Sequence, residues 1–190
     1  MAKNVKEKII DATTELIGEC HSIESVTVRD IATKAGVGVG LINYHFQTKE
    51  NLINQCVQKM IGNTINNFDK LYQALTMEPV DKLRFLTKKM CLFLDSNRGV
   101  SRISILSDLS AGNFSDNTSQ TINAYLPVMR EIYGQKKSDQ DLYLLIHMLM
   151  SALQSAFLRR DVFIESAEID FYDVKQRECL IDRLIDLLIK

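Results

Sequence analysis

The sequence predicts an all-α protein of about nine helices, and three observations lead to this fold class. Apolar residues recur at intervals of three and four along nearly the whole chain, which places them on one face of a helix. The 190 residues include only 8 glycines and 2 prolines, too few for the frequent turns of a β-rich fold. Apolar residues make up 46% and charged residues 25% of the chain, a balance typical of folded globular proteins.

Three helices are predicted in the N-terminal quarter of the chain. The first covers roughly residues 3–19, where the apolar positions keep helical spacing. Thr27 is a suitable cap for a second helix over about 28–35, and Gly36 then ends that helix in a turn. A third short helix is predicted over about 38–45.

Six further helices are predicted to follow, separated by turn signals. Pro79 suits the first turn of a helix, where its missing N–H is no loss, and the polar stretch 111–119 is the most loop-like part of the chain. Pro127 is expected to bend its helix or to mark a restart. The predicted ranges are about 49–76, 79–97, 100–110, 120–133, 139–160 and 173–189.

Charge, cysteine content and hydropathy predict a soluble, reduced, cytoplasmic protein without a membrane partner. The formal net charge is −1, so the whole chain has no positive field that would attract an anionic partner. The N-terminus is charged and lacks the apolar core of a secretory signal. The most apolar stretch, 142–153, has about half of the ~20 residues that a membrane span needs. No disulfide framework is expected, because the cysteines are far apart: Cys20, Cys56, Cys91 and Cys179.

No catalytic site, cofactor or metal site is predicted. The chain has 3 histidines and lacks the H-E-x-x-H, G-x-S-x-G and phosphate-loop motifs. The glycine-rich stretch 36–40 follows a predicted helix rather than a strand, which argues against dinucleotide binding. Cys20 and His21 are adjacent, but no nearby Cys or His completes a metal site. We therefore expect a protein that is not an enzyme.

The segment 27–52 has the packing pattern of a helix-turn-helix. Ile31 is expected to face inward from the first short helix and Ile42 to face back from the second. Ala32 suits a steep helix crossing that leaves little room for a side chain, and Gly36 suits a reversal with positive φ. A unit of this kind lays its second helix in the major groove of DNA.

The same segment resembles TetR-type transcriptional regulators. The residues that carry the resemblance are Ala35-Gly36-Val37, then Asn43-Tyr44-His45-Phe46, then Lys49-Glu50-Asn51-Leu52. Together with the preceding helices, the resemblance covers about residues 5–55. It implies a helix-turn-helix DNA-binding domain over 1–48 and a helical regulatory and dimerisation domain over 49–190.

The resemblance assigns DNA contacts to the outer face of the third helix and to positions at neighbouring helix starts. Phe46 is expected to pack inside. Val39 is suited to the methyl group of thymine and Asn43 to adenine, so an A·T-rich site is expected. The candidate DNA-binding residues are Thr27, Arg29, Gly38, Val39, Gly40, Leu41, Asn43, Tyr44, His45 and Lys49.

Charge opposes this assignment, because residues 1–52 contain six basic and seven acidic residues. A DNA-binding module usually has a basic excess. We therefore expect salt-dependent binding in which a second subunit supplies much of the affinity.

Two apolar stripes in the C-terminal half are candidates for pairing with a second copy across a two-fold axis. The alternative, which must hold for part of each stripe, is an internal core. A dimer would present its two reading helices at symmetric half-sites of a palindromic operator. The candidate interface residues are Leu142, Leu145, Leu149, Leu153, Phe157, Leu180, Leu184 and Leu187.

By the same resemblance, the helices between residues 49 and 133 are expected to enclose a site for an unknown small-molecule effector. For each aromatic or methionine residue taken singly, ordinary packing is the better interpretation. His147, on an apolar face, favours a satisfied core histidine over a ligand contact. The candidates are Phe68, Tyr72, Met90, Phe93, Tyr125, Met129 and His147.

These features predict a sequence-specific DNA-binding transcriptional regulator. The expected mode of action is repression, relieved when a small apolar or amphipathic ligand releases a homodimer from double-stranded DNA. The alternative is a helical protein-interaction adaptor, or a ligand-binding protein, without DNA binding.

Overall fold

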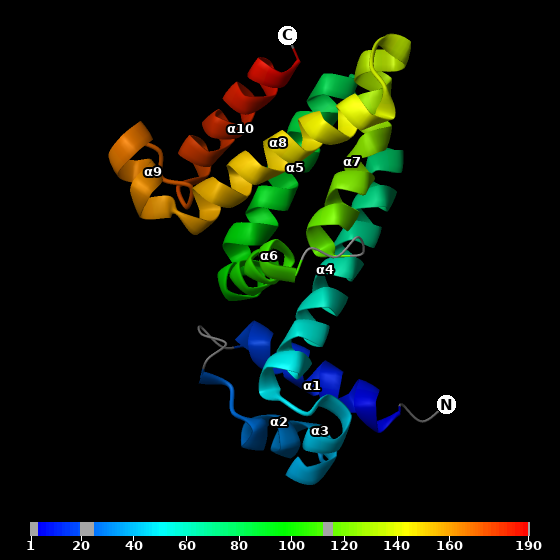
Figure 1. The fold of residues 1–190 in the computed structure, drawn as a ribbon, viewed down its shortest axis with the longest axis vertical. Helices are drawn as coiled ribbons and strands as arrows, with labels where there is room; N and C mark the ends of the chain where they lie inside the picture. Colours follow the sequence, from blue (N-terminus) through cyan, green and yellow to red (C-terminus); the bar gives the residue numbers. More distant parts are fainter. Residues whose placement is uncertain (1–3, 20–24, 112–115, 190) are drawn as a thin grey trace. The chain divides into compact units, whose positions relative to one another are not determined.

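The computed structural model describes residues 4–19, 25–111 and 116–189 and confirms the all-α prediction. In this part of the chain, the structure consists of ten α-helices and a short 3-10 helix, η2, without a strand (Figure 1). The helices are α1 Val5–Glu19, α2 Val28–Ala35, α3 Val39–Phe46, α4 Lys49–Ala74, α5 Pro79–Ser96, α6 Arg98–Ala111, α7 Asn117–Tyr133, η2 Gly134–Lys136, α8 Asp139–Leu158, α9 Arg160–Ala167 and α10 Val174–Leu188.

The helix predicted over about 139–160 ends at Leu158, and the sequence analysis did not predict the helix α9 that follows. The backbone leaves helical geometry at Arg159 (φ −111°, ψ 38°), where α8 ends and α9 begins. The apolar residues of α9 occur as a consecutive run rather than at helical spacing, and none of its residues is buried. The spacing of apolar residues therefore could not predict α9.

The start of α7 also differs from the prediction. Asp116 caps the helix by accepting a hydrogen bond from Ser119 N–H over 2.7 Å, so α7 begins three residues before the predicted residue 120. Pro127 lies inside a continuous helix.

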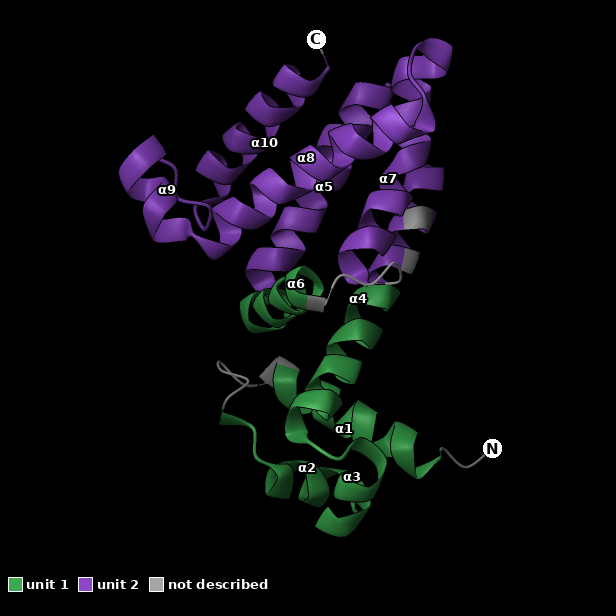
Figure 2. Ribbon diagram, in the orientation of Figure 1, with its two compact units in different colours: residues 1–63, 97–111 green, residues 64–96, 112–190 purple. Residues whose placement is uncertain are grey.

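The first compact unit comprises residues 1–63 and 97–111 (Figure 2). In its described part α1 packs against α2 and α3, and the first half of α4 and all of α6 belong to the same unit. Its core contains fully buried side chains from four helices: Ile9, Ile31, Ile42, Phe46 and Leu52. The compact unit therefore extends beyond residue 48, where the family resemblance placed the end of the DNA-binding domain.

The second compact unit comprises residues 64–96 and 112–190. Helices α5, α7, α8 and α10 pack against one another around an apolar core. Charged side chains join α5 to α10 at the edge of this core: the Arg84 guanidinium donates to Asp182 over 3.1 Å, and Lys88 donates to the same carboxylate over 2.8 Å. A buried guanidinium, Arg177, donates to Asp95 over 3.0 Å.

Candidate nucleic-acid interface

Helix α2 begins with a reciprocal pair of hydrogen bonds between Thr27 and Asp30. Thr27 Oγ1 accepts from the Asp30 N–H over 3.2 Å, and the Asp30 carboxylate accepts from the Thr27 N–H over 2.9 Å. The Thr27 hydroxyl also donates to this carboxylate over 2.6 Å. These hydrogen bonds lower the pKa of Asp30 below its ordinary value. The Thr27 hydroxyl, a candidate DNA contact, is thus already engaged by a carboxylate.

The turn between α2 and α3 has the geometry that the sequence predicts. Gly36 adopts the left-handed conformation (φ 65°, ψ 38°), which an L side chain rarely adopts. The Val37 N–H donates to Ala32 O over 3.0 Å, closing the end of α2. Ile31, Ala32 and Ile42 are buried where the two helices meet α1. The prediction of a helix-turn-helix is therefore confirmed.

Helix α3 keeps a full outer face free. Ile42 and Phe46 are buried, whereas Asn43 is exposed and Tyr44 retains 77% of its accessible surface. Val39 and Leu41 are 40% and 41% exposed. An apolar and aromatic face of this kind on a short helix is suited to contact with another molecule.

The two glycines at the start of α3 leave its backbone open. Gly38 is the N-cap in an extended conformation, and Gly40 lies in the first turn. A Cβ at either position would meet no heavy atom within 4 Å. Packing inside the protein therefore does not require glycine at either position, and the missing side chains allow close approach by a partner.

Aromatic rings line the C-terminal end of α3. Tyr44 and His45 meet edge to face with ring centroids 5.1 Å apart, and His45 lies 6.2 Å from Phe46. The Lys6 ammonium of α1 lies over the Phe46 ring, 5.6 Å from its centroid, a distance typical of cation–π contacts. Sequence reasoning missed Lys6, because only the fold brings α1 beside α3.

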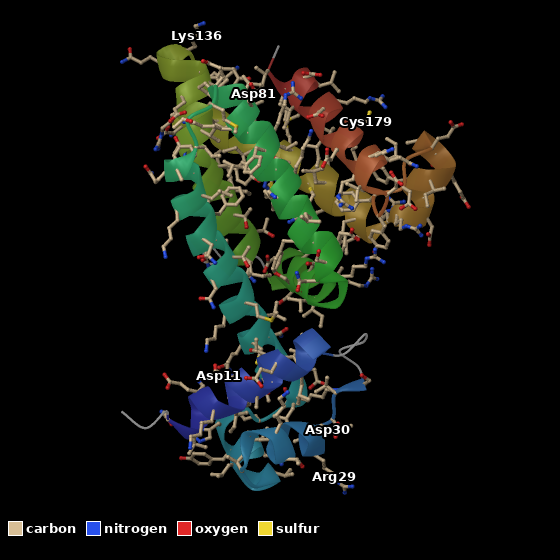
Figure 3. The ribbon with its side chains drawn as sticks, turned by 180° about the vertical axis from the view of Figure 1, so that it is seen from behind. Asp11, Arg29, Asp30, Asp81, Lys136 and Cys179 are labelled. Atoms are coloured by element: carbon tan, nitrogen blue, oxygen red, sulfur yellow. The ribbon has the colours of Figure 1, made fainter. Side chains whose placement is uncertain are left out.

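Some of the acidic side chains counted over residues 1–52 form ion pairs in this unit. Asp11 is paired with Lys59 over 2.8 Å and Glu15 with Lys34 over 3.5 Å, so two of the acidic residues face lysines. Arg29 is exposed, and Figure 3 shows its side chain pointing away from the helices. This exposed basic side chain of α2 could meet a phosphate.

The link from α3 to α4 places Lys49 in the first turn of α4. Gln47 has a positive φ of 62°, and Thr48 Oγ1 accepts a hydrogen bond from the Asn51 N–H over 3.1 Å. Thr48 is thus a helix cap that the sequence analysis did not assign. Lys49 is partly exposed beside this cap.

The structure brings some of the ligand candidates of the second unit together. Phe68 of α4 and Tyr125 of α7 have ring centroids 5.1 Å apart, and Tyr125 and Met129 are buried. The Tyr72 hydroxyl donates to the Glu131 carboxylate over 2.5 Å, and this contact adds to burial in raising the Tyr72 pKa to about 12. Met90 and Phe93 are half-buried on α5.

His147 does not join this group. It is exposed on α8 and stacks on Tyr143 with ring centroids 6.3 Å apart. The prediction of a buried core histidine was wrong, because the apolar residues around His147 in sequence belong to two different faces of the helix.

Most of the candidate interface residues lie inside the second unit. Leu145 and Leu184 are half-buried, and Leu187 is 66% exposed. The other five fill the unit's own core: Leu142, Leu149, Leu153, Phe157 and Leu180. For these five the internal-core alternative is correct.

The exposed apolar face of α8 consists instead of four residues that the sequence analysis did not assign to an interface: Tyr143, Leu144, His147 and Met148. Tyr143, Leu144 and Met148 are 37%, 59% and 61% exposed. Among the described helices, α8 is also the one whose length and composition would suffice to cross a membrane, a test that core helices of soluble proteins pass as well. No charged residue interrupts the helix between Leu142 and Leu158.

Metal ligation is not supported within the described residues. No group of three or more His, Cys, Asp or Glu side chains is placed to hold an ion there, and Cys20 and His21 lie outside the described residues.

Comparison with known proteins identifies the N-terminal segment. Residues 9–56 match the family model for bacterial regulatory proteins of the tetR family. No curated protein sequence matches the chain.

Several solved structures share the fold over almost the whole chain. A TetR transcriptional regulator from Rhodococcus sp. RHA1 is 19% identical, with a TM-score of 0.59 over 97% of this chain and 95% of that one. The fatty acid degradation regulator FadR from Bacillus halodurans is 20% identical, with a TM-score of 0.56 over 96% and 97%. FadR from Bacillus subtilis, solved with stearoyl-CoA, is 19% identical, with a TM-score of 0.57 over 97% of each chain. At these identities the likeness establishes the fold.

Proposed function

Through residues 9–56 this chain is a member of the tetR family of bacterial regulatory proteins, and on that premise we propose that it is a sequence-specific repressor of transcription. The observation that carries the proposal is the outer face of α3. This face carries the exposed side chains of Asn43 and Tyr44. At Gly38 and Gly40 its backbone has no side chain that would keep a partner away. A short helix with such a face, held by a buried opposite face, is suited to the major groove.

Binding to DNA is proposed to need two copies of the chain. Residues 1–52 contain six basic and seven acidic residues, so a second reading helix is required to reach useful affinity. The exposed face of α8 supports self-association, because four neighbouring apolar or aromatic side chains remain uncovered: Tyr143, Leu144, His147 and Met148. Leu187 of α10 is a further exposed apolar residue of the same unit. The operator would then be palindromic.

Release from DNA is proposed to follow binding of a small apolar or amphipathic ligand in the second unit. Helix α4 is one continuous helix whose residues 49–63 belong to the first unit and 64–74 to the second. Phe68 and Tyr72 on this helix contact α7, so a ligand that alters these contacts acts on the helix that begins beside α3. The ligand lowers the affinity for DNA only as far as it binds the released conformation more tightly than the DNA-binding conformation.

The proposal is tested by selecting DNA fragments that the purified full chain retains from genomic DNA, followed by mobility-shift titration. We expect a subset of fragments to be retained and affinity to fall steeply with salt. Tyr44→Ala should weaken binding roughly tenfold or more, without lowering the unfolding temperature, because Tyr44 is 77% exposed.

Leu109→Ala is the matched control. Leu109 is 68% exposed and lies on α6 of the same unit, away from the sequence assigned to DNA contact. Its replacement should leave DNA affinity unchanged. A wild-type chain that retains no fragment, or a Tyr44→Ala variant that binds as well as wild type, would overturn the proposal and favour a helical adaptor.

A further inference from the structure

His147 is the one histidine in the sequence of the second unit. The chain contains 3 histidines; His45 lies on α3 of the first unit, and His21 lies outside the described residues. Histidine changes its charge between about pH 5 and 8, whereas ordinary carboxylates take up protons at lower pH. Mild acidification therefore adds charge to the second unit chiefly at His147.

The exposed face of α8 around His147 is uncharged. The imidazole stacks on Tyr143, one turn earlier, with ring centroids 6.3 Å apart and an angle of 11° between the rings. Leu144 and Met148 are the exposed apolar neighbours on the same face. No charged residue occurs in α8 between Leu142 and Leu158. The imidazole is thus the group of this face that becomes charged at mildly acidic pH.

No described carboxylate is in place to compensate a cationic His147 within one copy. At the start of α8, Asp139 is held by Arg130 and Asp141 by Ser138. Most charged residues of α5, α7, α9 and α10, the helices that pack against α8, form ion pairs with one another. The charged residues of these helices and their ends that lie outside such pairs have no described contact with His147: Asp81, Lys89, Arg159, Glu165, Glu168, Lys175 and Arg183.

A second copy of the chain is an occupant that suits this face. An uncharged surface meets no like-charge repulsion from its own copy, and a two-fold axis brings the same residues of both copies together. A neutral His147 can be covered with the apolar side chains around it. A protonated His147 would lose its hydration without gaining a carboxylate, which is unfavourable. The stack on Tyr143 already exists in the single copy, so it does not offset this loss.

We propose that self-association through the α8 face is controlled by pH: two copies associate while His147 is neutral and separate as it gains a proton. This rests on the proposed function in one respect, namely that this face joins the two copies. The separate copies bind the proton and the dimer excludes it, so acid favours separation. Both copies contribute a histidine, so two protons act on each dimer.

The first test is sedimentation equilibrium of the full chain at pH 7.5 and 5.5 and constant ionic strength. A proton that must be excluded weakens association by up to about tenfold for each pH unit below the midpoint of its titration. With two histidines in each dimer, we expect the Kd of self-association to rise roughly 100-fold between the two pH values. Far-UV circular dichroism checks that the helices are retained at both. An unchanged Kd would overturn the inference.

Three variants assign the response to one residue. His147→Gln stays neutral, so its Kd should be nearly the same at both pH values. His147→Lys carries a fixed charge and should be largely monomeric at both. His45→Gln is the matched control, because it removes the described histidine of the first unit, and it should keep the pH response of wild type. A His147→Gln variant that responds to pH as wild type does would show that other groups cause the response and that the inference is wrong.

The outcome is separable from that of the proposed function, since retention of DNA fragments is measured independently at pH 7.5. A chain that retains DNA but has the same Kd of self-association at both pH values leaves the repressor function standing and overturns this inference. A chain whose Kd depends on His147 and pH but that retains no DNA supports this inference and overturns the repressor function.

Discussion

The Thr27 hydroxyl donates a 2.6 Å hydrogen bond to the Asp30 carboxylate while its oxygen accepts from the Asp30 N–H over 3.2 Å. This closed pair determines how the chain enters α2, the first helix of the helix-turn-helix. A side chain that sequence resemblance assigns to DNA therefore also stabilises the unit that carries α3.

Thr27→Ala should lower the free energy of unfolding by about 1 kcal/mol, because it removes the N-cap of α2. The hydrogen bonds from Thr27 lower the pKa of Asp30, so the folded state favours the carboxylate. This stabilisation is complete above the ordinary Asp pKa and is lost as pH falls through the lowered folded-state pKa. Urea unfolding across the acidic range measures it. Asp30→Asn should be less sensitive to acid than wild type, and an equal sensitivity of both would show that the carboxylate contributes nothing.

Gly40→Ala should separate stability from DNA binding. Alanine is favoured over glycine inside a helix by roughly 1 kcal/mol, and a Cβ at Gly40 meets nothing within 4 Å, so unfolding should require more urea. The same methyl group stands on the open backbone of α3 and should weaken DNA binding in mobility-shift titration. Gly62→Ala on α4, equally unobstructed, is the control that should gain stability and keep its DNA affinity. Unchanged DNA affinity in Gly40→Ala would contradict a close backbone approach.

The helix-turn-helix of the N-terminal unit could be predicted from the sequence, because its pattern has short-range causes. Glycine at residue 36 indicates the positive φ that the structure shows at 65°, and helical spacing places Ile31 and Ile42 inside. The prediction that Phe46 packs inside while Tyr44 faces outward is also confirmed by their exposure of 1% and 77%. These positions depend on residues close to them in the chain.

The C-terminal unit was less predictable, because α8 is apolar on more than one face. Leu149 and Met148 are neighbours in sequence, yet one is buried and the other is 61% exposed. Composition could not decide which face is covered by α5, α7 and α10 and which remains free.

Met148→Glu should convert the proposed dimer to a monomer. In the proposed dimer, the exposed face of α8 becomes covered by the second copy. The introduced carboxylate would then be buried without a partner, at a cost in free energy that self-association cannot offset. Sedimentation or light scattering measures the change in mass, and far-UV circular dichroism checks that the fold is retained. Met77→Glu is the matched control, because Met77 is an exposed methionine outside any helix, and it should remain dimeric. A Met148→Glu variant with the mass of wild type would exclude this face from the interface.

The buried pair between Arg177 and Asp95 should contribute far more to stability than the exposed pair between Arg130 and Asp139. The Arg177 side chain is 2% and that of Asp95 14% exposed, whereas those of Arg130 and Asp139 are 52% and 60% exposed. Asp95→Ala leaves a desolvated guanidinium with the Phe171 carbonyl and ring as its remaining described contacts, which should cost about 3–5 kcal/mol in urea unfolding.

Asp139→Ala breaks a solvent-screened pair and should give no measurable change. The variant that replaces both Arg177 and Asp95 with leucine should recover part of the loss, since it removes the unpaired charge as well as its partner. If Asp95→Ala is as mild as Asp139→Ala, water reaches the Arg177 guanidinium.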